Sequence, residues 1–110
     1  MIEVLNIPIV QGGGPFQENI LLENEEYIFA FHFNQRSPAW YLTIEKNGEI
    51  IVRESKIIAG YNLLDSAISA EKLSGFLYLY DVDLQTSLGN DPGVNDLGNR
   101  IILVYEEKTE

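Results

Sequence analysis

The sequence contains no cysteine, so disulfide bonds and thiolate metal sites are excluded and the redox compartment stays open. It contains a single histidine, and no Ser/His/Asp or Cys/His set can be recognised for nucleophilic catalysis. No apolar run approaches the roughly 20 residues that a membrane helix needs. No signal peptide is expected, because the first residues, Met1–Val4, lack a basic and an apolar region.

Basic residues are also scarce, since 7 Lys and Arg stand against 17 Asp and Glu, for a net charge of −10. This charge disfavours nucleic-acid binding by electrostatic attraction, so no sequence-specific nucleic acid is expected as a partner. No membrane is expected as a partner either, because no apolar run is long enough to span one. A well-solvated acidic surface is the simplest account of the charge. The alternative is a surface that repels DNA, as the lining of a DNA conduit must.

The strongest local signal is the Asn47-Gly48 dipeptide between two β-prone runs. A type I′ turn needs positive φ at both central residues, and Asn and Gly tolerate that conformation best. Before the turn, Trp40, Leu42 and Ile44 alternate with polar or smaller residues, as in a strand buried on one face. We therefore predict a central hairpin with Trp40 and Leu42 in the core.

Further strands are predicted on both sides of this hairpin. Tyr27–Asn34 alternates most cleanly, with Phe31 and Phe33 among four aromatics on one face, and a polar turn at residues 23–26 precedes it. The other predicted strands are residues 2–10, 16–24, 76–80 and 99–106. Because both faces of residues 76–80 are apolar, we predict that this strand is central and covered on both sides.

The predicted fold is all-β: a small antiparallel β-sandwich or partly open barrel of about seven strands, with at most one or two helical turns near 62–73. Residues 1–110 are predicted to form one β domain. Within it, residues 1–15 are a candidate N-terminal arm with a Gly-rich hinge, and residues 106–110 are a tail.

Two segments are candidate interfaces. The glycines of the hinge uncouple the first strand, which can either pair locally or reach a neighbouring subunit. The long loop from Leu84 to Gly98 has few apolar anchors, so we expect both segments to be ordered only when neighbours bind. The candidate interface residues are Ile2, Val4, Leu5, Ile7, Gly12, Gly13, Gly14, Leu88, Val94 and Leu97.

The sequence offers four candidate ligand sites: His32, two acidic clusters and one group of aromatic residues. His32 is expected to be packed or half-exposed, because a lone histidine on a strand has no partners. Two acidic clusters resemble hard-cation sites, but turn chemistry explains them better, so no metal or cofactor is predicted. They are Asp81 with Asp83, and Asn90, Asp91, Asn95 and Asp96 in the loop. A sugar-stacking platform of Trp40, Tyr41, Tyr61 and Tyr78 is the alternative to a buried Trp40.

Several short motifs, in this order, resemble one known family. They are Phe16-Gln17-Glu18-Asn19-Ile20, Tyr27-x-Phe29-x-Phe31-x-Phe33-Asn34-x-Arg36, Trp40-Tyr41-Leu42, Gly60-Tyr61-Asn62-Leu63-Leu64 and the closing Asp96 to Tyr105 run. The likeness is to the baseplate plug proteins of contractile-tailed cyanophages and related myophages, and it spans about Phe16 to Tyr105. The sequence departs from the family in the polar region 69–74 and in the Gly-rich segment 11–15.

The resemblance implies a non-enzymatic virion structural protein, assembled in the host cytoplasm into the tail baseplate. It would close or join the tail tube near the central hub, in multiple copies. Its implied partners are hub, tube or tube-initiator subunits, and the tape measure protein. The residues expected to support this fold are Phe31, Phe33, Trp40, Leu42, Asn47, Gly48, Gly98 and Tyr105. The alternative function is a stand-alone carbohydrate- or ligand-binding β-sandwich, which an exposed Trp40 coplanar with Tyr61 would favour.

Overall fold

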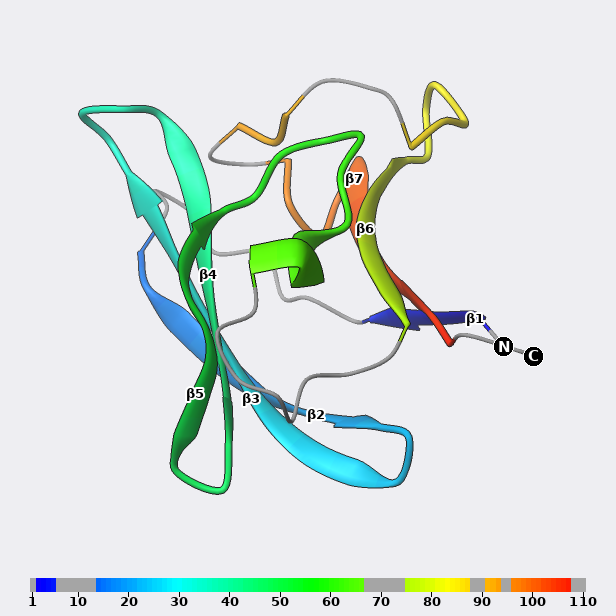
Figure 1. Cartoon of the computed structure of the whole chain (residues 1–110). Helices are drawn as coiled ribbons and strands as arrows, with labels where there is room; N and C mark the ends of the chain where they lie inside the picture. Colours follow the sequence, from blue (N-terminus) through cyan, green and yellow to red (C-terminus); the bar gives the residue numbers. More distant parts are fainter. Residues whose placement is uncertain (1, 6–13, 67–74, 88–90, 94–95, 108–110) are drawn as a thin grey trace.

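Seven strands in two antiparallel sheets form the computed structural model, which describes residues 2–5, 14–66, 75–87, 91–93 and 96–107. The smaller sheet has the order β1-β7-β6, and the larger has the order β2-β3-β4-β5. Figure 1 shows the larger sheet on the left and the smaller on the right. The strands are β1 (Ile2–Leu5), β2 (Phe16–Leu22), β3 (Glu25–Asn34), β4 (Ala39–Lys46), β5 (Glu49–Lys56), β6 (Phe76–Asp81) and β7 (Ile101–Glu106).

This arrangement confirms the predicted small all-β sandwich, built from two open sheets rather than a barrel. The described helical element is η2 (Leu63–Ser66), a single 3-10 turn within the predicted helical region. The rest of that prediction, residues 67–73, lies outside the described residues. No helix in the described segments has the length and apolar character needed to cross a membrane.

Two hairpins of the larger sheet close with two-residue turns. Asn47 and Gly48 have φ of 52° and 83°, and Lys46 pairs with Glu49, which confirms the predicted turn. The β2–β3 turn uses the same geometry at Glu23 and Asn24, with φ of 51° and 65°. The sequence predicted a polar turn at residues 23–26, whereas the observed turn contains only Glu23 and Asn24. A glutamate at positive φ is uncommon, so this shorter turn had no clear signal in the sequence.

A β-bulge distorts the pairing of β4 with β5. Leu42 pairs with Ser55 and Ile44 with Val52, so two residues of β5 lie opposite Thr43. One of them, Glu54, has a positive φ of 41°, and its backbone N–H donates to Thr43 Oγ1 at 3.0 Å. The extra residue breaks the period-2 alternation of β5.

The core lies between the sheets and is rich in aromatic rings. Tyr27, Phe29 and Phe31 of β3 are buried as predicted, and Phe33 packs against them from the rim. Phe16 stacks on Phe31 with ring centroids 4.9 Å apart, which extends the aromatic cluster to β2. The smaller sheet contributes Leu5, Leu77, Leu79, Leu103 and Tyr105 from its inner face.

Tyr105 joins the two sheets through a buried hydrogen-bond network. Its ring is fully buried, and its hydroxyl donates to the Glu23 carboxylate and accepts from the Gly75 backbone N–H at 3.0 Å. Burial, followed by the hydrogen bond to Glu23, raises the pKa of Tyr105 well above its ordinary value. A Cβ at Gly75 would lie 2.3 Å from the Glu106 carbonyl oxygen, so only glycine fits at this position.

The predicted central position of residues 76–80 is wrong. β6 lies at the edge of the smaller sheet, and β7 is the central strand. Leu77 and Leu79 face the core, whereas Phe76 on the other face is 49% exposed. The strand is apolar on both faces, as predicted, but its second face is partly open to solvent. The apolar character of residues 76–80 therefore did not distinguish a central strand from an edge strand.

β7 begins two residues later than the predicted last strand. The backbone N–H groups of Asn99 and Ile101 both donate to the Asp96 carbonyl oxygen at 3.0 Å, which forms a turn before the strand. Gly98 takes a φ of 82° in this turn, consistent with its expected structural role. β7 includes Glu106, so the predicted tail begins later, and residues 108–110 lie outside the described residues.

Candidate assembly surfaces

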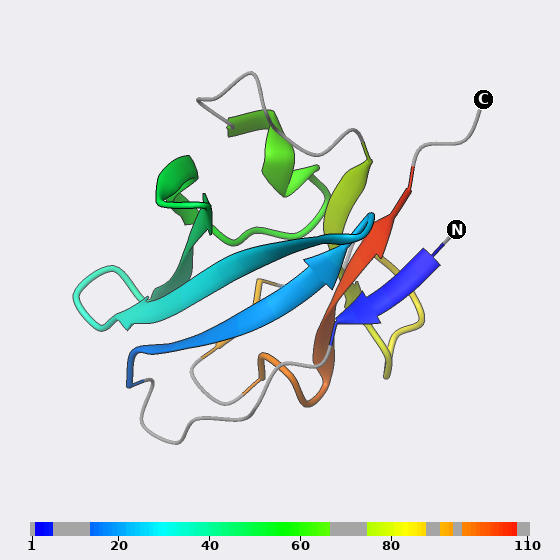
Figure 2. The same cartoon turned by 90° about the horizontal axis from the view of Figure 1, so that it is seen from below.

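The sequence left open whether the first strand pairs within the chain or reaches a neighbouring subunit. In the structure it pairs within the chain. β1 pairs along its length with β7, from Ile2 opposite Glu106 to Leu5 opposite Leu103 (Figure 2). Leu5 is buried in the core, so it serves packing in this structure and not an interface. Val4 is 62% exposed and is free to contact a partner. Ile7, Gly12 and Gly13 lie outside the described residues, and Gly14 is half-buried before β2.

The described parts of the 84–98 loop are bound to the body of the chain, contrary to the expected lack of anchors. Trp40 Nε1 donates to the Gly93 carbonyl oxygen at 2.9 Å, and Asp91 Oδ1 accepts from the Ala59 N–H at 2.8 Å. Leu97 is buried in the core, so it is not available as the interface residue that we predicted. Leu88 and Val94, the other two candidates in this loop, lie outside the described residues.

The two acidic clusters show turn chemistry, as predicted. Asp81 Oδ1 accepts hydrogen bonds from the backbone N–H groups of Asp83 and Leu84, and Asp96 Oδ2 accepts from Gly93. Asp83 lies beyond the end of β6, so the two carboxylates of this cluster are not on one strand face. Within the described segments, no group of three His, Asp or Glu side chains could hold a metal ion. Asn90 and Asn95 lie outside those segments.

Asp81 carries the main buried charge of this region. The side chain is 2% exposed, and its Oδ2 lies 3.8 Å from Arg100 Nε, which is an ion pair but not a hydrogen bond. Arg100 also reaches Asp96 Oδ2 at 3.8 Å. The guanidinium therefore offsets two carboxylates where the 84–98 loop meets β7, which is a structural role.

His32 is half-buried on the solvent side of β3 and stacks on Tyr41, with ring centroids 5.4 Å apart. This agrees with the expectation of a packed or half-exposed histidine. Trp40 is 1% exposed, which confirms its predicted core position and removes it from any sugar-stacking platform with Tyr61.

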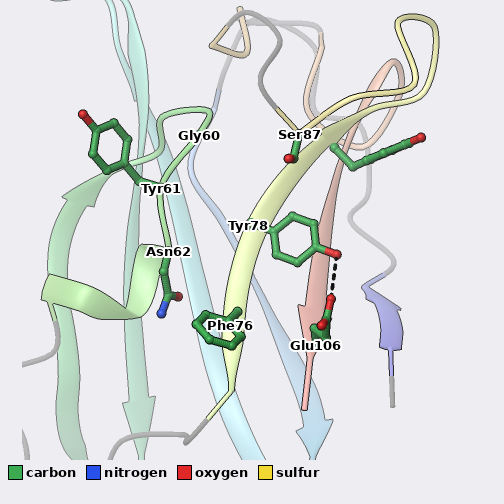
Figure 3. Close-up of a pocket in the computed structure, with 8 residues that line it drawn as sticks. Gly60, Tyr61, Asn62, Phe76, Tyr78, Ser87 and Glu106 are labelled. Atoms are coloured by element: carbon green, nitrogen blue, oxygen red, sulfur yellow. Dashed lines mark hydrogen bonds between the residues drawn. The ribbon is translucent and has the colours of Figure 1, made fainter. Parts of the chain in front are cut away.

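An aromatic groove that the sequence analysis missed lies beside β6 (Figure 3). It has a volume of about 420 Å³, and Phe76 and Tyr78 line it from β6. Tyr61 lies on the neighbouring 60–62 segment, with its ring directed away from β6. The lining residues are Gly60, Tyr61, Asn62, Phe76, Tyr78, Tyr80, Ser87 and Glu106. The signal that could have found the groove is the second apolar face of residues 76–80, which we read as buried.

The groove has a polar end at Glu106. The Tyr78 hydroxyl donates to Glu106 Oε1 at 3.3 Å. Burial, and then the charge of Glu106, raises the pKa of Tyr78 above its ordinary value. A tyrosine hydroxyl is protonated at neutral pH with or without this shift, so Tyr78 remains a donor to Glu106.

β2 carries a second unusual group at the edge of the larger sheet. Glu18 shares the inward face of β2 with Phe16 and Ile20, and burial raises the pKa of its carboxyl group. An inward-pointing charge on an edge strand discourages pairing of that edge with another chain. The edge of β2 is therefore a poor site for strand addition.

Taken together, the described residues form two packed sheets with exposed apolar side chains, and no group of three His, Asp or Glu side chains among them could hold a metal ion. These features define a small β-sandwich whose exposed apolar side chains are available for contacts with other proteins. Residues 4–108 match the family described as cyanophage baseplate Pam3 plug gp18. Because this match covers nearly the whole chain, the chain belongs to that baseplate plug family.

The family confirms the resemblance that the sequence motifs carried. The chain has a structural role in a phage tail baseplate, where it assembles with other baseplate proteins. No curated protein matches this chain.

Proposed function

We propose that the chain is a non-enzymatic plug subunit at the hub end of a contractile phage tail tube, where it acts by protein–protein assembly. The observation that carries this proposal is the family match over residues 4–108. It is supported by exposed apolar side chains on the described surface, which would be buried against neighbours. They are Val4, Leu21, Tyr61, Phe76, Val82 and Leu84.

The charge of the chain supports a position along the DNA path. With a net charge of −10, the protein repels the phosphate backbone, so DNA would pass its surface without being retained. The same charge favours partners that carry basic residues at the contact surface. The proposed partners are the hub, the tube or tube-initiator subunits and the tape measure protein, with several copies of the plug per baseplate.

We propose that the chain folds as one domain in the host cytoplasm before it joins the baseplate. In the assembled tail, the remaining interface candidates Ile2, Ile7, Gly12, Gly13, Gly14, Leu88 and Val94 would contact neighbours together with Val4. Val4 supports this most directly, because it is exposed on a strand whose backbone is already paired with β7.

An amber mutation in the gene of the encoding phage tests the proposal. Without suppression, tails should lack the protein and show a defective hub end by electron microscopy, and infectivity should fall by several orders of magnitude. Supplying the wild-type chain from a plasmid should restore both. Normal tails and normal infectivity without the protein would contradict a structural role in the plug.

A further inference from the structure

The outer face of the smaller sheet is apolar although it faces away from the core. In the strand register, Tyr78 of β6 and Val4 of β1 both pair with Val104 of β7, and Tyr80 pairs with Ile102. Residues directly opposite each other share a face, so these side chains form one continuous surface. Antiparallel sheets with one face in solvent normally carry polar residues on that face. An apolar outer face is therefore typical of a sheet that packs against another protein.

The aromatic groove is the part of this face best shaped to receive a partner. Tyr61 and Phe76, which line it, are 63% and 49% exposed. Two large aromatic rings left in water beside a hollow of about 420 Å³ are typical of a binding site, because such rings gain the most from burial.

Internal hydrogen bonds preform the walls of the groove. Asn62 Oδ1 accepts from the N–H groups of Leu64 and Leu77 at 3.1 and 3.0 Å, which fixes the 60–62 segment against β6. The Gly60 N–H donates to the Ser87 carbonyl oxygen at 3.1 Å on the other side. A preformed groove loses little entropy when a ligand binds.

Hydrogen bonds within the chain already occupy two positions at the edge of β6. The outward N–H of Leu77 is occupied by Asn62, and Asp81 exchanges backbone hydrogen bonds with Thr86. A partner strand would find these positions of the edge already taken. Recognition at this site therefore depends on side chains that enter the groove.

The charge of the groove indicates which side chains of a partner protein fit it. Among the lining residues that the structure describes, Glu106 is the one carboxylate, and none is Lys or Arg. A second copy of this chain would bring another net charge of −10 to the contact, which disfavours self-association. An apolar side chain next to a lysine or arginine satisfies both the aromatic walls and the Glu106 carboxylate.

We propose that the groove binds a segment of another baseplate protein that inserts an apolar side chain over Phe76 and Tyr78 and places a lysine or arginine against Glu106. This inference rests on the proposed function and adds the binding site and the chemistry of the partner.

Photo-crosslinking in assembled phage particles tests the site. The amber strain is complemented with the chain carrying p-benzoylphenylalanine at Phe76, at Tyr61, or at Leu21 as the control. Leu21 is 64% exposed but lies on β2 of the larger sheet. After irradiation of purified baseplates, Phe76 and Tyr61 should crosslink to the same peptide of another baseplate protein, with an apolar residue beside Lys or Arg. The Leu21 position should not yield that peptide.

Crosslinks from both groove positions to a second copy of this chain, or to an acidic segment, would overturn the proposal. So would the absence of groove crosslinks in baseplates that contain the photo-labelled protein. If the wild-type chain is itself missing from purified baseplates, the proposed function fails instead, and the two failures are thereby distinguished.

A charge reversal supplies the second measurement. Glu106→Lys should lower the number of copies per baseplate at least tenfold, as measured by quantitative mass spectrometry of purified particles. Glu106→Gln, which keeps an acceptor for Tyr78, should have a smaller effect. Glu26→Lys makes the same charge change at an exposed position near the start of β3, and this variant should be incorporated like the wild type. Equal incorporation of Glu106→Lys and Glu26→Lys would contradict the proposed role of Glu106.

Discussion

At the residue scale, Trp40 is the largest of the fully buried side chains. Its ring is 1% exposed, packs edge-on against Phe16 and Phe33, and binds the Gly93 carbonyl through Nε1. Trp40→Ala should lower the free energy of unfolding by about 3–5 kcal/mol, because it leaves a cavity and removes an anchor of the 84–98 loop. Urea denaturation is the measurement, with Tyr41→Ala as the half-buried neighbour on the opposite face. A loss below about 1 kcal/mol would place the ring at the surface.

The raised pKa of Tyr105 makes the free energy of unfolding depend on pH in the alkaline range. Its pKa is raised in the folded chain, by burial and by the hydrogen bond to Glu23, so the folded state holds the phenolic proton more tightly than the unfolded state does. The stabilisation is fully present below the unfolded pKa of about 10 and is lost as the pH rises above it. Burial also raises the pKa of Tyr27 and Tyr78, which contribute in the same direction.

Tyr105→Phe isolates this contribution. At pH 7 the variant should lose about 1–3 kcal/mol, because the buried N–H of Gly75 is left without its acceptor. Between pH 9 and pH 11 its free energy of unfolding should fall less steeply than that of the wild type. Tyr61→Phe, at an exposed ring, is the control and should retain the wild-type slope. Identical slopes for wild type and Tyr105→Phe would mean that another group titrates.

At the scale of elements, the Asn47-Gly48 hairpin tests backbone strain without steric interference. A Cβ at Gly48 would meet no atom within 4 Å, so the effect of a side chain comes from the φ of 83° alone. Gly48→Val should cost about 1–3 kcal/mol, because a β-branched residue is forced into the left-handed region. Glu49→Lys, one residue on, should change stability by less than about 0.5 kcal/mol. Similar costs in thermal unfolding for both variants would contradict the two-residue turn.

A matched pair of variants tests whether β1 is intramolecular in the free protein. Leu5 is buried opposite Leu103, whereas its neighbour Val4 is mostly exposed on the other face. Leu5→Ala should cost about 2–5 kcal/mol in urea denaturation, and Val4→Ala less than about 0.5 kcal/mol. If both variants are as stable as the wild type, β1 is not docked on β7 until a partner binds.

Local pattern predicted the individual elements well, because hairpin turns and strand faces depend on neighbouring residues. The Asn47-Gly48 turn and the buried face of β3 follow directly from dipeptide chemistry and period-2 alternation. The order of strands depends on contacts distant in sequence, such as Ile2 opposite Glu106, which no local pattern encodes. The expected central position of β6 failed for this reason, and the pairing of β1 with β7 was one of two alternatives that the sequence left open.

The aromatic groove was missed for a related physical reason. An apolar face is equally favourable against a second layer of the same chain or against another chain, so Phe76 and Tyr78 could not distinguish these cases. The Glu23-Asn24 turn was missed because its glutamate is held at positive φ within reach of Tyr105, which lies 82 residues away in sequence.

At the scale of the whole molecule, three features favour assembly with other baseplate proteins. They are the family, the acidic charge and the apolar outer face of the smaller sheet. A net charge of −10 keeps the free chain dispersed by mutual repulsion, and it stays compatible with partners that carry basic residues. The larger sheet is protected at its β2 edge by the inward-facing Glu18, whereas the smaller sheet carries the aromatic groove that we propose receives a partner.

A cryo-electron microscopy reconstruction of the baseplate from the encoding phage tests the central claim most directly. The account predicts density for two sheets of three and four strands at the hub end of the tail tube, in several symmetric copies. The outer face of the β1-β7-β6 sheet should be covered there by another baseplate protein. A reconstruction in which this fold is absent from the baseplate, or lies at its periphery away from the tube, would contradict the account.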